Sequence, residues 1–333
     1  MAVTLKDVAV LAGVSRSAVS RTYTEGASIS LKTRTKVMQA ATELGYSPNA
    51  LASSLTTGRT KMIGLVSNNF HNPIFLEVFD LFTRGLQERG LRPLLVNLTD
   101  ETDPEAWVRM LRQYSVDGVI VASSTLPPAF AKAFRDAGVP VVHSFGRHSD
   151  DPAVDVLGID NIAAGSLAAR TLIERGYTEL GFLGGPSDAT STLDREKGFL
   201  AEIALNAGVK ATTSFATAYS FEAGRAEMTR LLEAKPVQAY FCGDDVLSIG
   251  ALSALQSFGL KVPDDVGLIG LNDMEMAGWD NINLTTIHNP FSEIIAASID
   301  RVSALVEDQD IPPQARLFDC SVVERGTLRA RKT

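Results

Sequence analysis

The sequence predicts an α/β protein with a small all-α head at the N-terminus, a short hinge helix and a core of two doubly wound parallel α/β lobes. Three observations support this prediction. Two short helical segments flank Gly13, and hydroxyl residues stand at their expected starts. A polar stretch follows the head. After Met62, apolar strands alternate with amphipathic helices, which is the pattern of parallel βαβ units.

Charge separates the head from the rest of the chain. The 333 residues carry 31 basic and 39 acidic side chains, for a net charge of −8. Residues 1–60 hold seven basic and three acidic side chains, so the head carries +4. The remaining 24 basic and 36 acidic side chains give −12. A basic head on an acidic body indicates that only the head meets a polyanion.

Composition excludes several classes of protein. The hydrophobic content of 45% supports a globular core, so the chain is neither disordered nor fibrous. No stretch approaches the roughly 18 apolar residues that a membrane span needs. Cys242 and Cys320 lie in strand-like segments without metal or redox spacing. We therefore expect a cytoplasmic, nucleoid-associated protein with no membrane contact, no metal and no cofactor.

The head, residues 1–46, is predicted to be a helix-turn-helix domain. Thr4 can cap the helix LKDVAVLA, Gly13 ends it, and Ser15 can cap the next helix. Two short helices joined by a tight turn with a glycine are typical of this motif. The apolar residues expected to meet across the turn are Val8, Ala9, Leu11, Val14 and Val19.

The second helix presents a face suited to a DNA groove. Val19 points inward, which leaves Arg16, Ser17 and Arg21 outward. Small residues let a helix enter the major groove, and arginine can donate two hydrogen bonds to the edge of guanine. The alternative is a solvated helix face, since the run SRSAVSR by itself can occur anywhere.

Hydroxyl side chains in the head are candidates for contacts with phosphates, which position a protein on DNA without reading its sequence. A third helix follows, with Ser30 as its cap and Gly45 at its end. The expected contacts to the DNA backbone are Thr4, Ser15, Ser20, Thr22, Ser30 and Thr33.

Residues 47–60 form a polar connector that can become a hinge helix. A Pro-Asn pair can start a helix here and Gly58 can stop it. So short a helix is marginal alone in water, so we expect it to order only with a partner. Leu51 and Leu55 lie one turn apart in this segment. They are either a docking contact or a wedge inserted between base pairs in the minor groove.

The body, residues 61–333, is predicted to bind an effector and to dimerise. Helix, glycine cap and buried strand follow one another repeatedly, as in LAARTLIERG followed by TELGFLG. We expect lobe 1 to comprise about 61–159 and 290–317, and lobe 2 about 160–289 and 318–330. In such sheets, ligands bind beyond the carboxyl ends of the strands.

Polar pairs follow the predicted strands, and they suit a polyhydroxylated ligand because each sugar hydroxyl both donates and accepts. Arg195 adds a bidentate donor, and Phe75 and Phe221 are candidates for an aromatic wall. For any single polar residue, the alternative is a loop cap. His71 and His288 each begin a His-Asn-Pro turn without a metal partner at ligand spacing. The pairs are Asn68 and Asn69, Ser123 and Ser124, Asp160 and Asn161, Asp244 and Asp245, and Asn272 and Asp273.

The sequence gives little support to an enzyme. It has no nucleophile elbow, phosphate-binding loop or metalloprotease motif. A two-lobed solute-binding module or a sugar-modifying enzyme without a DNA role is the alternative to a regulator. An enzyme would turn over its ligand, whereas a regulator would bind it unchanged. The basic helix-turn-helix favours the regulator.

Several runs resemble the LacI/GalR family of bacterial transcription regulators over essentially the whole chain. They are VTLKDVAVLAGVSRSAVSRT, TRTKVMQAATELGYSPNALASSL, DREKGF, FCGDD, VPDDVGLIGLND and LTTIHNP. The resemblance implies a core like that of periplasmic binding proteins. It also implies a homodimer that represses by binding a palindromic double-stranded operator, under allosteric control by a small effector. The polar residues at the strand ends favour a sugar or sugar derivative as that effector.

The resemblance also assigns roles to residues. It puts Arg16, Ser17 and Arg21 in base-reading positions. It puts Asn49, Ala52 and Leu55 in the hinge that contacts the minor groove, with Leu55 as the wedge. Strand ends and resemblance together give the expected effector contacts, which are Asn68, Phe75, Ser123, Asp160, Arg195, Phe221, Asp245 and Asn272.

Overall fold

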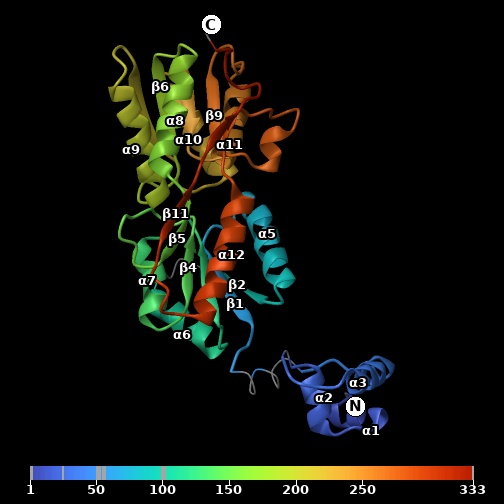
Figure 1. The fold of residues 1–333 in the computed structure, drawn as a ribbon. Helices are drawn as coiled ribbons and strands as arrows, with labels where there is room; N and C mark the ends of the chain where they lie inside the picture. The colour runs from blue at the N-terminus through green and yellow to red at the C-terminus, as the bar shows by residue number, and fades with distance from the viewer. Residues whose placement is uncertain (1–2, 25, 50–53, 55–57, 99–102, 332–333) are drawn as a thin grey trace. The chain divides into compact units, whose positions relative to one another are not determined.

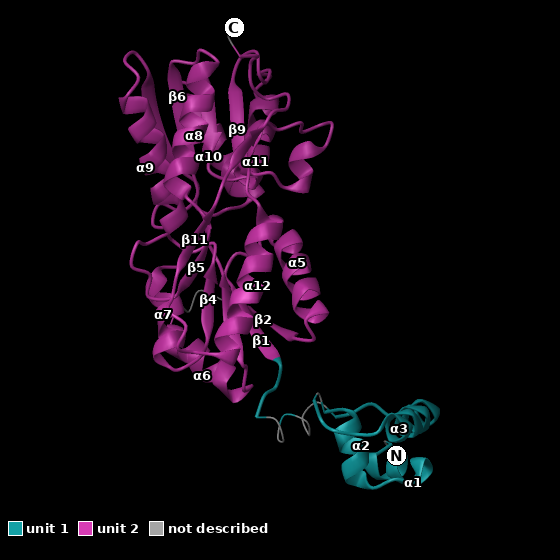
Figure 2. Cartoon of the chain, viewed as in Figure 1, with its two compact units in different colours: residues 1–61 teal, residues 62–333 magenta. Residues whose placement is uncertain are grey.

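The computed structural model describes residues 3–24, 26–49, 54, 58–98 and 103–331. The chain divides into two compact units, residues 1–61 and residues 62–333 (Figures 1 and 2). The second unit contains two sheets covered by helices, and their strands pair in parallel except where residues 321–323 pair antiparallel with residues 286–288. The predicted α/β class with an all-α head is confirmed.

Unit 1 consists of α1 (Leu5–Ala12), α2 (Arg16–Thr22) and α3 (Leu31–Leu44). The backbone N–H and the hydroxyl of Thr4 both donate to Asp7 Oδ2, at 2.8 and 2.7 Å, so Asp7 satisfies donors at the start of α1. Gly13 ends α1 with a φ of 65°, which a glycine adopts without strain. Ser15 Oγ accepts from the backbone N–H of Ala18 at 3.2 Å and caps α2.

The core of unit 1 is small and differs from the prediction at one position. Val8, Val19 and Val37 are completely buried, one from each helix. Leu11, which we expected to face the turn, is 46% exposed, and Ala12 is buried in its place. The reason is helix geometry, because residues 8, 9 and 12 share one face of α1 and residue 11 lies off it.

The first sheet of unit 2 defines lobe 1, and its strand order is β11-β5-β4-β3-β1-β2. Parallel pairing such as Leu65 with Leu95 and with Ile120 sets its register. Its strands are β1 (Met62–Ser67), β2 (Arg92–Asn97), β3 (Gly118–Ala122), β4 (Val141–Ser144), β5 (Asp155–Ile159) and β11 (Ala315–Phe318). Its helices are α5 (Ile74–Glu88), α6 (Pro104–Gln113), α7 (Pro128–Asp136) and α12 (Phe291–Glu307).

Alternation along β3 shows how this sheet is buried on both faces. Ile120 packs in the cluster that contains residues of α5 and α12, such as Phe82 and Ile299. Its neighbour Val121 packs in a separate cluster with residues of α6 and α7, such as Phe134. Successive side chains of a strand point to opposite faces, so a strand covered on both sides is a continuous apolar run. This explains why GVIVA carries no polar residue.

The second sheet defines lobe 2, and its order is β12-β10-β9-β8-β6-β7. The chain passes between the lobes after β5, after β10 and after β11. The strands are β6 (Glu179–Gly184), β7 (Lys210–Phe215), β8 (Ala239–Cys242), β9 (Gly267–Asn272), β10 (Thr286–His288) and β12 (Ser321–Val323). The helices are α8 (Asn161–Glu174), α9 (Thr190–Ala204), α10 (Phe221–Ala234), α11 (Asp245–Ser257) and the 3-10 helix η1 (Glu275–Gly278).

Glycines bring the helices of lobe 2 into close contact. A Cβ on Gly165 of α8 would lie 2.1 Å from the carbonyl oxygen of Arg195 in α9. A Cβ on Gly198 of α9 would lie 1.9 Å from the carbonyl oxygen of Ile162 in α8. Only glycine permits backbones to approach this closely. The contact sets the position of α9 and therefore that of Arg195.

Candidate functional site

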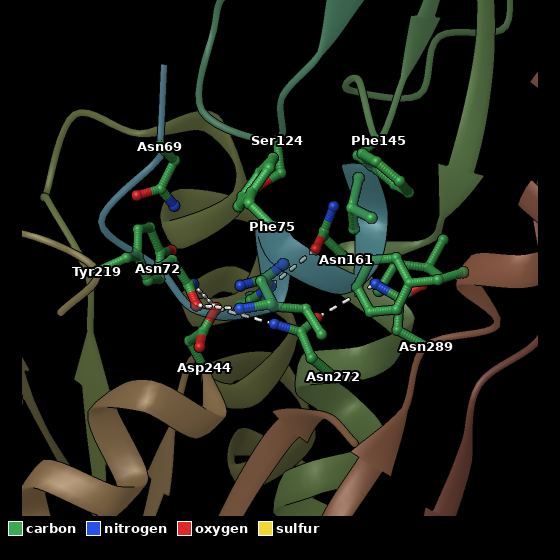
Figure 3. A pocket seen from close by; sticks show the side chains of 15 residues that line it. Asn69, Asn72, Phe75, Ser124, Phe145, Asn161, Tyr219, Asp244, Asn272 and Asn289 are labelled. Carbon is green, nitrogen blue, oxygen red and sulfur yellow. Dashed lines mark hydrogen bonds between the residues drawn. The ribbon is translucent and has the colours of Figure 1, made fainter. Parts of the chain in front are cut away.

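A cavity of about 520 Å³, counted with its open mouth, lies where the carboxyl ends of the two sheets face each other (Figure 3). Both lobes contribute to its wall. The lining residues are Asn69, Asn72, Ile74, Phe75, Val78, Ser124, Phe145, Ile159, Asn161, Arg195, Tyr219, Asp244, Asn272, Asn289 and Phe291.

Asp244 is the acceptor at the centre of the cavity's polar network (Figure 3). Its Oδ2 accepts from Nδ2 of Asn72 at 2.9 Å and from Nδ2 of Asn272 at 2.8 Å. Its Oδ1 accepts from the backbone N–H of Val246 at 2.9 Å and starts α11. Burial raises the pKa of the Asp244 carboxyl to about 6, and these donors oppose that rise.

Arg195 is a buried donor held by lobe 2. Its Nε donates to Oδ1 of Asn161 at 2.8 Å, and its Nη1 donates to the carbonyl oxygen of Gly243 at 2.5 Å. Its Nη2 donates to none of the described residues, which leaves that group for a bound molecule. A guanidinium fixed by two bonds loses little freedom when a ligand accepts from it.

Two His-Asn-Pro turns supply an asparagine each from opposite parts of the chain. Asn72 precedes α5 and donates to Asp244. Asn289 precedes α12, and its Nδ2 donates to Oδ1 of Asn272 at 3.2 Å. Oδ1 of Asn289 is buried and accepts from no described residue. An unpaired buried acceptor at a cavity wall is a position for a ligand N–H or O–H group.

Aromatic rings close the apolar part of the cavity, and two lining residues have strained backbones. Phe145 and Phe291 pack edge to face, with ring centroids 5.4 Å apart. Phe145 has a φ of 66° and Asn272 a φ of 122°, both in the left-handed half of the map that side chains rarely adopt. Such strain persists only where the surrounding structure imposes it, and it often marks binding sites.

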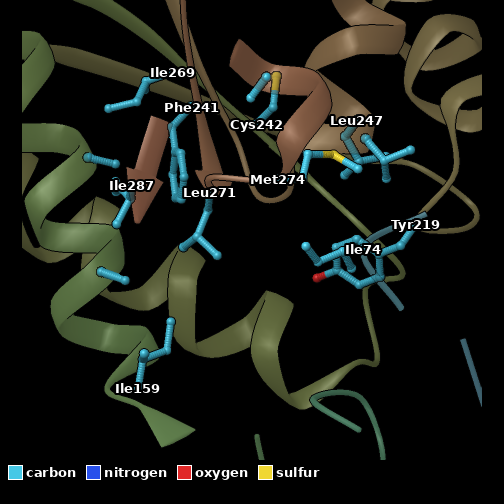
Figure 4. Close-up of a cluster of buried hydrophobic side chains, with 14 of the residues drawn as sticks. Ile74, Ile159, Tyr219, Phe241, Cys242, Leu247, Ile269, Leu271, Met274 and Ile287 are labelled. Atoms are coloured by element: carbon cyan, nitrogen blue, oxygen red, sulfur yellow. The ribbon is translucent and has the colours of Figure 1, made fainter. Parts of the chain in front are cut away.

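The polar wall rests on a buried apolar cluster that includes residues of both lobes (Figure 4). Phe241, Cys242 and Leu271 are completely buried beside the strand ends that carry Asp244 and Asn272. Ile74 and Ile159 belong to the same cluster and also line the cavity. Close packing of this kind holds the polar side chains in one geometry.

Three of the expected effector residues, Phe75, Arg195 and Asn272, line the cavity. The other five do not, and in each case a residue one or two positions away does so instead. These neighbours are Asn69 for Asn68, Ser124 for Ser123, Asn161 for Asp160, Tyr219 for Phe221 and Asp244 for Asp245.

Each of the five displaced residues has a structural partner elsewhere. Ser123 donates to Oδ1 of Asn68 at 2.8 Å within lobe 1. Asp160 caps α8 by accepting from Ile162 and Ala163 N–H groups. Phe221 packs against the apolar core at the start of α10. In the four consecutive pairs, only one side chain lines the cavity, because beyond the end of a strand the turn of the loop sets the direction of each side chain.

Asp245 lies behind the cavity wall. Its Oδ1 accepts from the hydroxyl of Thr286 at 2.5 Å, and its Oδ2 accepts from the N–H of Met274 at 2.9 Å. The side chain is completely buried, and burial raises the pKa of its carboxyl to about 7, with the nearby Asp244 adding to the rise. Asp245 therefore ties α11 to the strand β10 and to the segment after β9.

In unit 1, the three expected base readers are exposed on α2. Arg16, Ser17 and Arg21 all face solvent, while Val19 of the same helix is buried. Ser17 and the cap residue Ser15 share a hydrogen bond of 2.9 Å between their hydroxyls. Two cations and a small hydroxyl on one exposed helix face have the chemistry that major-groove reading requires.

The expected backbone contacts divide into exposed and buried groups. Thr4, Ser15, Ser20 and Ser30 are exposed, and Thr33 is half-buried. Thr22 differs, because it is 6% exposed and its hydroxyl donates to the carbonyl oxygen of Ala18 at 2.9 Å. Its side chain packs into unit 1, because it lies one helical turn from Ala18 on the inner side of α2. A phosphate contact by Thr22 is thus not favoured.

The hinge prediction lies largely outside the described residues. Ala52 and Leu55 are not described, and Asn49 is exposed at the end of the described part of the head. Within the described ranges, no three His, Cys, Asp or Glu side chains converge as a metal site. No described helix has the length and apolar character needed to cross a membrane.

Comparison with protein families gives two matches along the chain. Residues 4–49 match the model described as bacterial regulatory proteins, lacI family. Residues 169–328 match the periplasmic binding protein-like domain. The chain is 33% identical over 335 residues to the HTH-type transcriptional repressor PurR of Proteus mirabilis (strain HI4320), covering 97% of both proteins. It is 34% identical over 339 residues to PurR of Escherichia coli O139:H28, covering 98% of both.

Solved structures are similar over nearly the whole chain. The lac repressor dimer bound to operator and the anti-inducer ONPF matches with a TM-score of 0.88 and 26% identity, covering 99% of this chain and 100% of that one. The complex of the transcriptional regulator CelR with cellobiose matches with a TM-score of 0.72 and 28% identity, covering 98% and 100%. Both matches include the head and the two-lobed body.

Proposed function

The chain belongs to the lacI family of bacterial regulatory proteins, and from this premise we propose that it represses transcription as a homodimer on a palindromic operator. It is a DNA-binding regulator with an effector-binding domain, as the family resemblance predicted. Its relatives are transcriptional repressors, and we propose no catalytic role for this chain. We assign it to the cytoplasm, where its operator would lie.

The exposed face of α2 is the observation that carries the DNA-reading proposal. Arg16 and Arg21 present guanidinium groups that recognise guanine by bidentate bonds, and Ser17 adds an adaptable hydroxyl between them. The charge of +4 on residues 1–60 attracts the phosphate backbone, whereas the charge of −12 on the remainder repels it. DNA binding is therefore confined to unit 1.

Selection from a random duplex pool tests this proposal. The purified protein is incubated with the pool at near-physiological salt, because affinity for DNA depends steeply on salt. We expect recovered sequences to contain a palindrome whose half-sites carry guanines. Sequence-blind recovery, with and without candidate effectors, would contradict the proposal of a specific dimeric reader.

The interlobe cavity is proposed as the effector site. Five asparagines, Asp244 and Arg195 line it, so donors and acceptors alternate around its wall. A small neutral molecule with several groups that both donate and accept, such as a sugar or sugar derivative, matches this wall. The CelR–cellobiose complex supports this class, since that relative holds a sugar. Phe75 and Tyr219 offer apolar faces for a ring.

Direct contacts between the lobes suggest how an effector would act on the DNA-binding state. In lobe 1, the backbone carbonyl oxygen of Ser124 accepts two hydrogen bonds from lobe 2. One comes from the hydroxyl of Thr190 at 3.0 Å and the other from the backbone N–H of Ser191 at 3.2 Å. Arg147 of lobe 1 pairs with Asp194 of lobe 2 at 2.5 Å. A ligand that binds the closed arrangement better than an open one shifts the population toward closure. A coupling of about 1–3 kcal/mol is sufficient to change operator occupancy.

An exposed apolar surface is proposed as part of the dimer contact. Leu76 on α5 is 76% exposed, and Trp279 at the end of η1 is 48% exposed. The two elements are adjacent, because the N–H of Glu275 in η1 donates to Oε1 of Glu77 in α5 at 3.1 Å. Large apolar side chains gathered on a surface are typical of an interface. We assign this surface to a second copy of the chain.

A further inference from the structure

A second cavity lies in lobe 1 at the end of the sheet opposite to the effector cavity. Its volume is about 450 Å³ with the solvent at its open mouth included, and none of its described lining residues also lines the effector cavity. The starts of β4 and β5 border it, together with the carboxyl end of α12. The effector cavity instead borders the ends of these strands and the start of α12, at Phe291. The helix α12 therefore connects the two cavities.

The wall of this second cavity is mostly apolar, with one buried carboxylate. Val141, Val154 and Leu305 line it and are each more than nine-tenths buried. Asp155 also lines it, and its side chain is only 2% exposed. A buried carboxylate among aliphatic side chains is costly unless its oxygens accept hydrogen bonds.

Only one oxygen of Asp155 accepts hydrogen bonds from other described residues. Oδ1 accepts from Nε of Arg301 at 2.6 Å and from the backbone N–H of Gln314 at 3.1 Å. Oδ2 accepts from no other described residue. A carboxylate has about four lone-pair positions, so this oxygen remains a strong acceptor at the cavity wall.

Charges around the cavity favour an uncharged partner. Arg301 already neutralises Asp155, so a second cation would meet a guanidinium at short range. An anion would meet the unpaired oxygen of Asp155. Arg135, at the rim, is engaged with the carbonyl oxygen of Ala153 and with Asp136. The fitting group is a neutral hydroxyl or N–H, which donates to the carboxylate without adding charge.

We propose that this cavity is a second ligand site, which takes a small, uncharged, largely apolar molecule whose single hydroxyl or N–H group donates to Asp155. The site is independent of the effector cavity, so it can be occupied whether or not the proposed effector is correct.

Two isomeric probes test the proposal, namely benzyl alcohol, which carries a donor, and anisole, which does not. Each is titrated into full-length protein with labelled Ile, Leu and Val methyl groups, and methyl spectra are recorded. We expect saturable shifts at Val139, Val141, Val154 and Leu305, with benzyl alcohol half-saturating at a concentration roughly fivefold or more below that of anisole. Shifts without saturation, equal affinities, or saturable shifts only at Ile74, Val78 and Ile159 would overturn it.

Two kinds of variant test the role of the cavity and the role of the Asp155 carboxylate separately. Val139→Phe fills the cavity and should abolish the saturable shifts, whereas Val209→Phe in lobe 2 is the matched control that should keep them. If Val139→Phe fails to fold, Gln309→Trp at the rim takes its place. The double variant Asp155→Leu, Arg301→Met removes both charges together, because removing one would leave the other charge buried without its partner. It should keep anisole binding and lose the preference for benzyl alcohol; a retained preference contradicts the role of Asp155.

Discussion

Asn72 of lobe 1 donates from Nδ2 to Oδ2 of Asp244 in lobe 2, across 2.9 Å, in the wall of the interlobe cavity that we propose as the effector site. Asn272 donates to the same oxygen from within lobe 2. One carboxylate oxygen thus joins the two lobes at the place where an effector would bind. Any molecule in the cavity must either add to this bond or replace it.

Removing the bond should loosen the contact between the lobes. We expect Asn72→Ala to increase exchange of the Ser191 amide, which donates to Ser124 across the lobes, by about tenfold or more. The basis is a hydrogen bond to a charged acceptor, which contributes about 1.5–3 kcal/mol. Hydrogen–deuterium exchange measures the exchange rate of the Ser191 amide. Asn206→Ala, which removes a bond within lobe 2, is the control, and equal exchange in the two variants would contradict the prediction.

Asp245 should make stability depend on pH. Burial raises the pKa of its carboxyl from 3.8 to about 7, so the folded protein keeps this proton to a higher pH than the unfolded chain. Its contribution to the free energy of unfolding is therefore full at low pH and is lost as pH rises through about 7. Relative to Asp245→Asn, which cannot ionise, the wild type should lose about 2 kcal/mol between pH 5 and pH 7.5. Chemical denaturation at both pH values tests this, and parallel pH profiles would refute it.

Gly165→Ala should weaken effector binding, although Gly165 does not line the cavity. The new Cβ would lie 2.1 Å from the carbonyl oxygen of Arg195, so α9 must move and carry Arg195 with it. We expect a loss of about 1–3 kcal/mol in stability, together with weaker effector binding. Denaturant unfolding measures the change in stability, and calorimetry measures the affinity for the effector. Gly278→Ala is the control because its nearest neighbour would be 3.6 Å away. An unchanged affinity in Gly165→Ala would show that Arg195 is not positioned by this contact.

Arg21 and Ser20 are adjacent exposed residues of α2, and replacing each with alanine should change DNA binding in a different way. Arg21→Ala should relax base preference at one position of each half-site, at a cost of about 1–3 kcal/mol for the preferred sequence. Ser20→Ala should weaken binding to all DNA sequences alike, because a contact to phosphate does not depend on the base. Binding to a panel of single-base operator variants distinguishes them. If Arg21→Ala weakened every sequence equally, Arg21 would be a phosphate contact.

Leu76→Arg should dissociate the dimer. The substitution places a charge in the apolar surface formed with Trp279, and a buried unpaired charge is strongly unfavourable. Leu205→Arg is the matched control, since Leu205 is 81% exposed but lies after α9, away from this surface. Size-exclusion chromatography with light scattering gives the mass. A dimer that survives Leu76→Arg would place the interface elsewhere.

Local structure could be predicted from the sequence because its causes are local. The caps at Thr4, Ser15 and Ser30 and the helix ends at Gly13 and Gly45 follow from neighbouring backbone groups, and the structure confirms them. The alternation of strands and helices follows from the period of the apolar residues. Leu11 is the exception, since only packing of three helices showed which face of α1 is inside.

Two cavity residues, Asn72 and Asn289, were missed although a signal was present. Each is the central residue of a His-Asn-Pro turn, and the repeat of this turn before α5 and α12 is visible in the sequence. The asparagines cross to Asp244 and Asn272, and that pairing joins residues far apart in the chain.

The sequence by itself determined that polar pairs stand at the strand ends and that a basic reader helix precedes an acidic two-lobed body. Only the tertiary structure decided which member of each pair faces the cavity, as with Asp244 over Asp245 and Asn161 over Asp160. The physical reason is that periodicity ends with the strand. Beyond it, the direction of a side chain depends on how the loop turns and on which distant donor, such as Thr286 for Asp245, is brought within hydrogen-bonding distance.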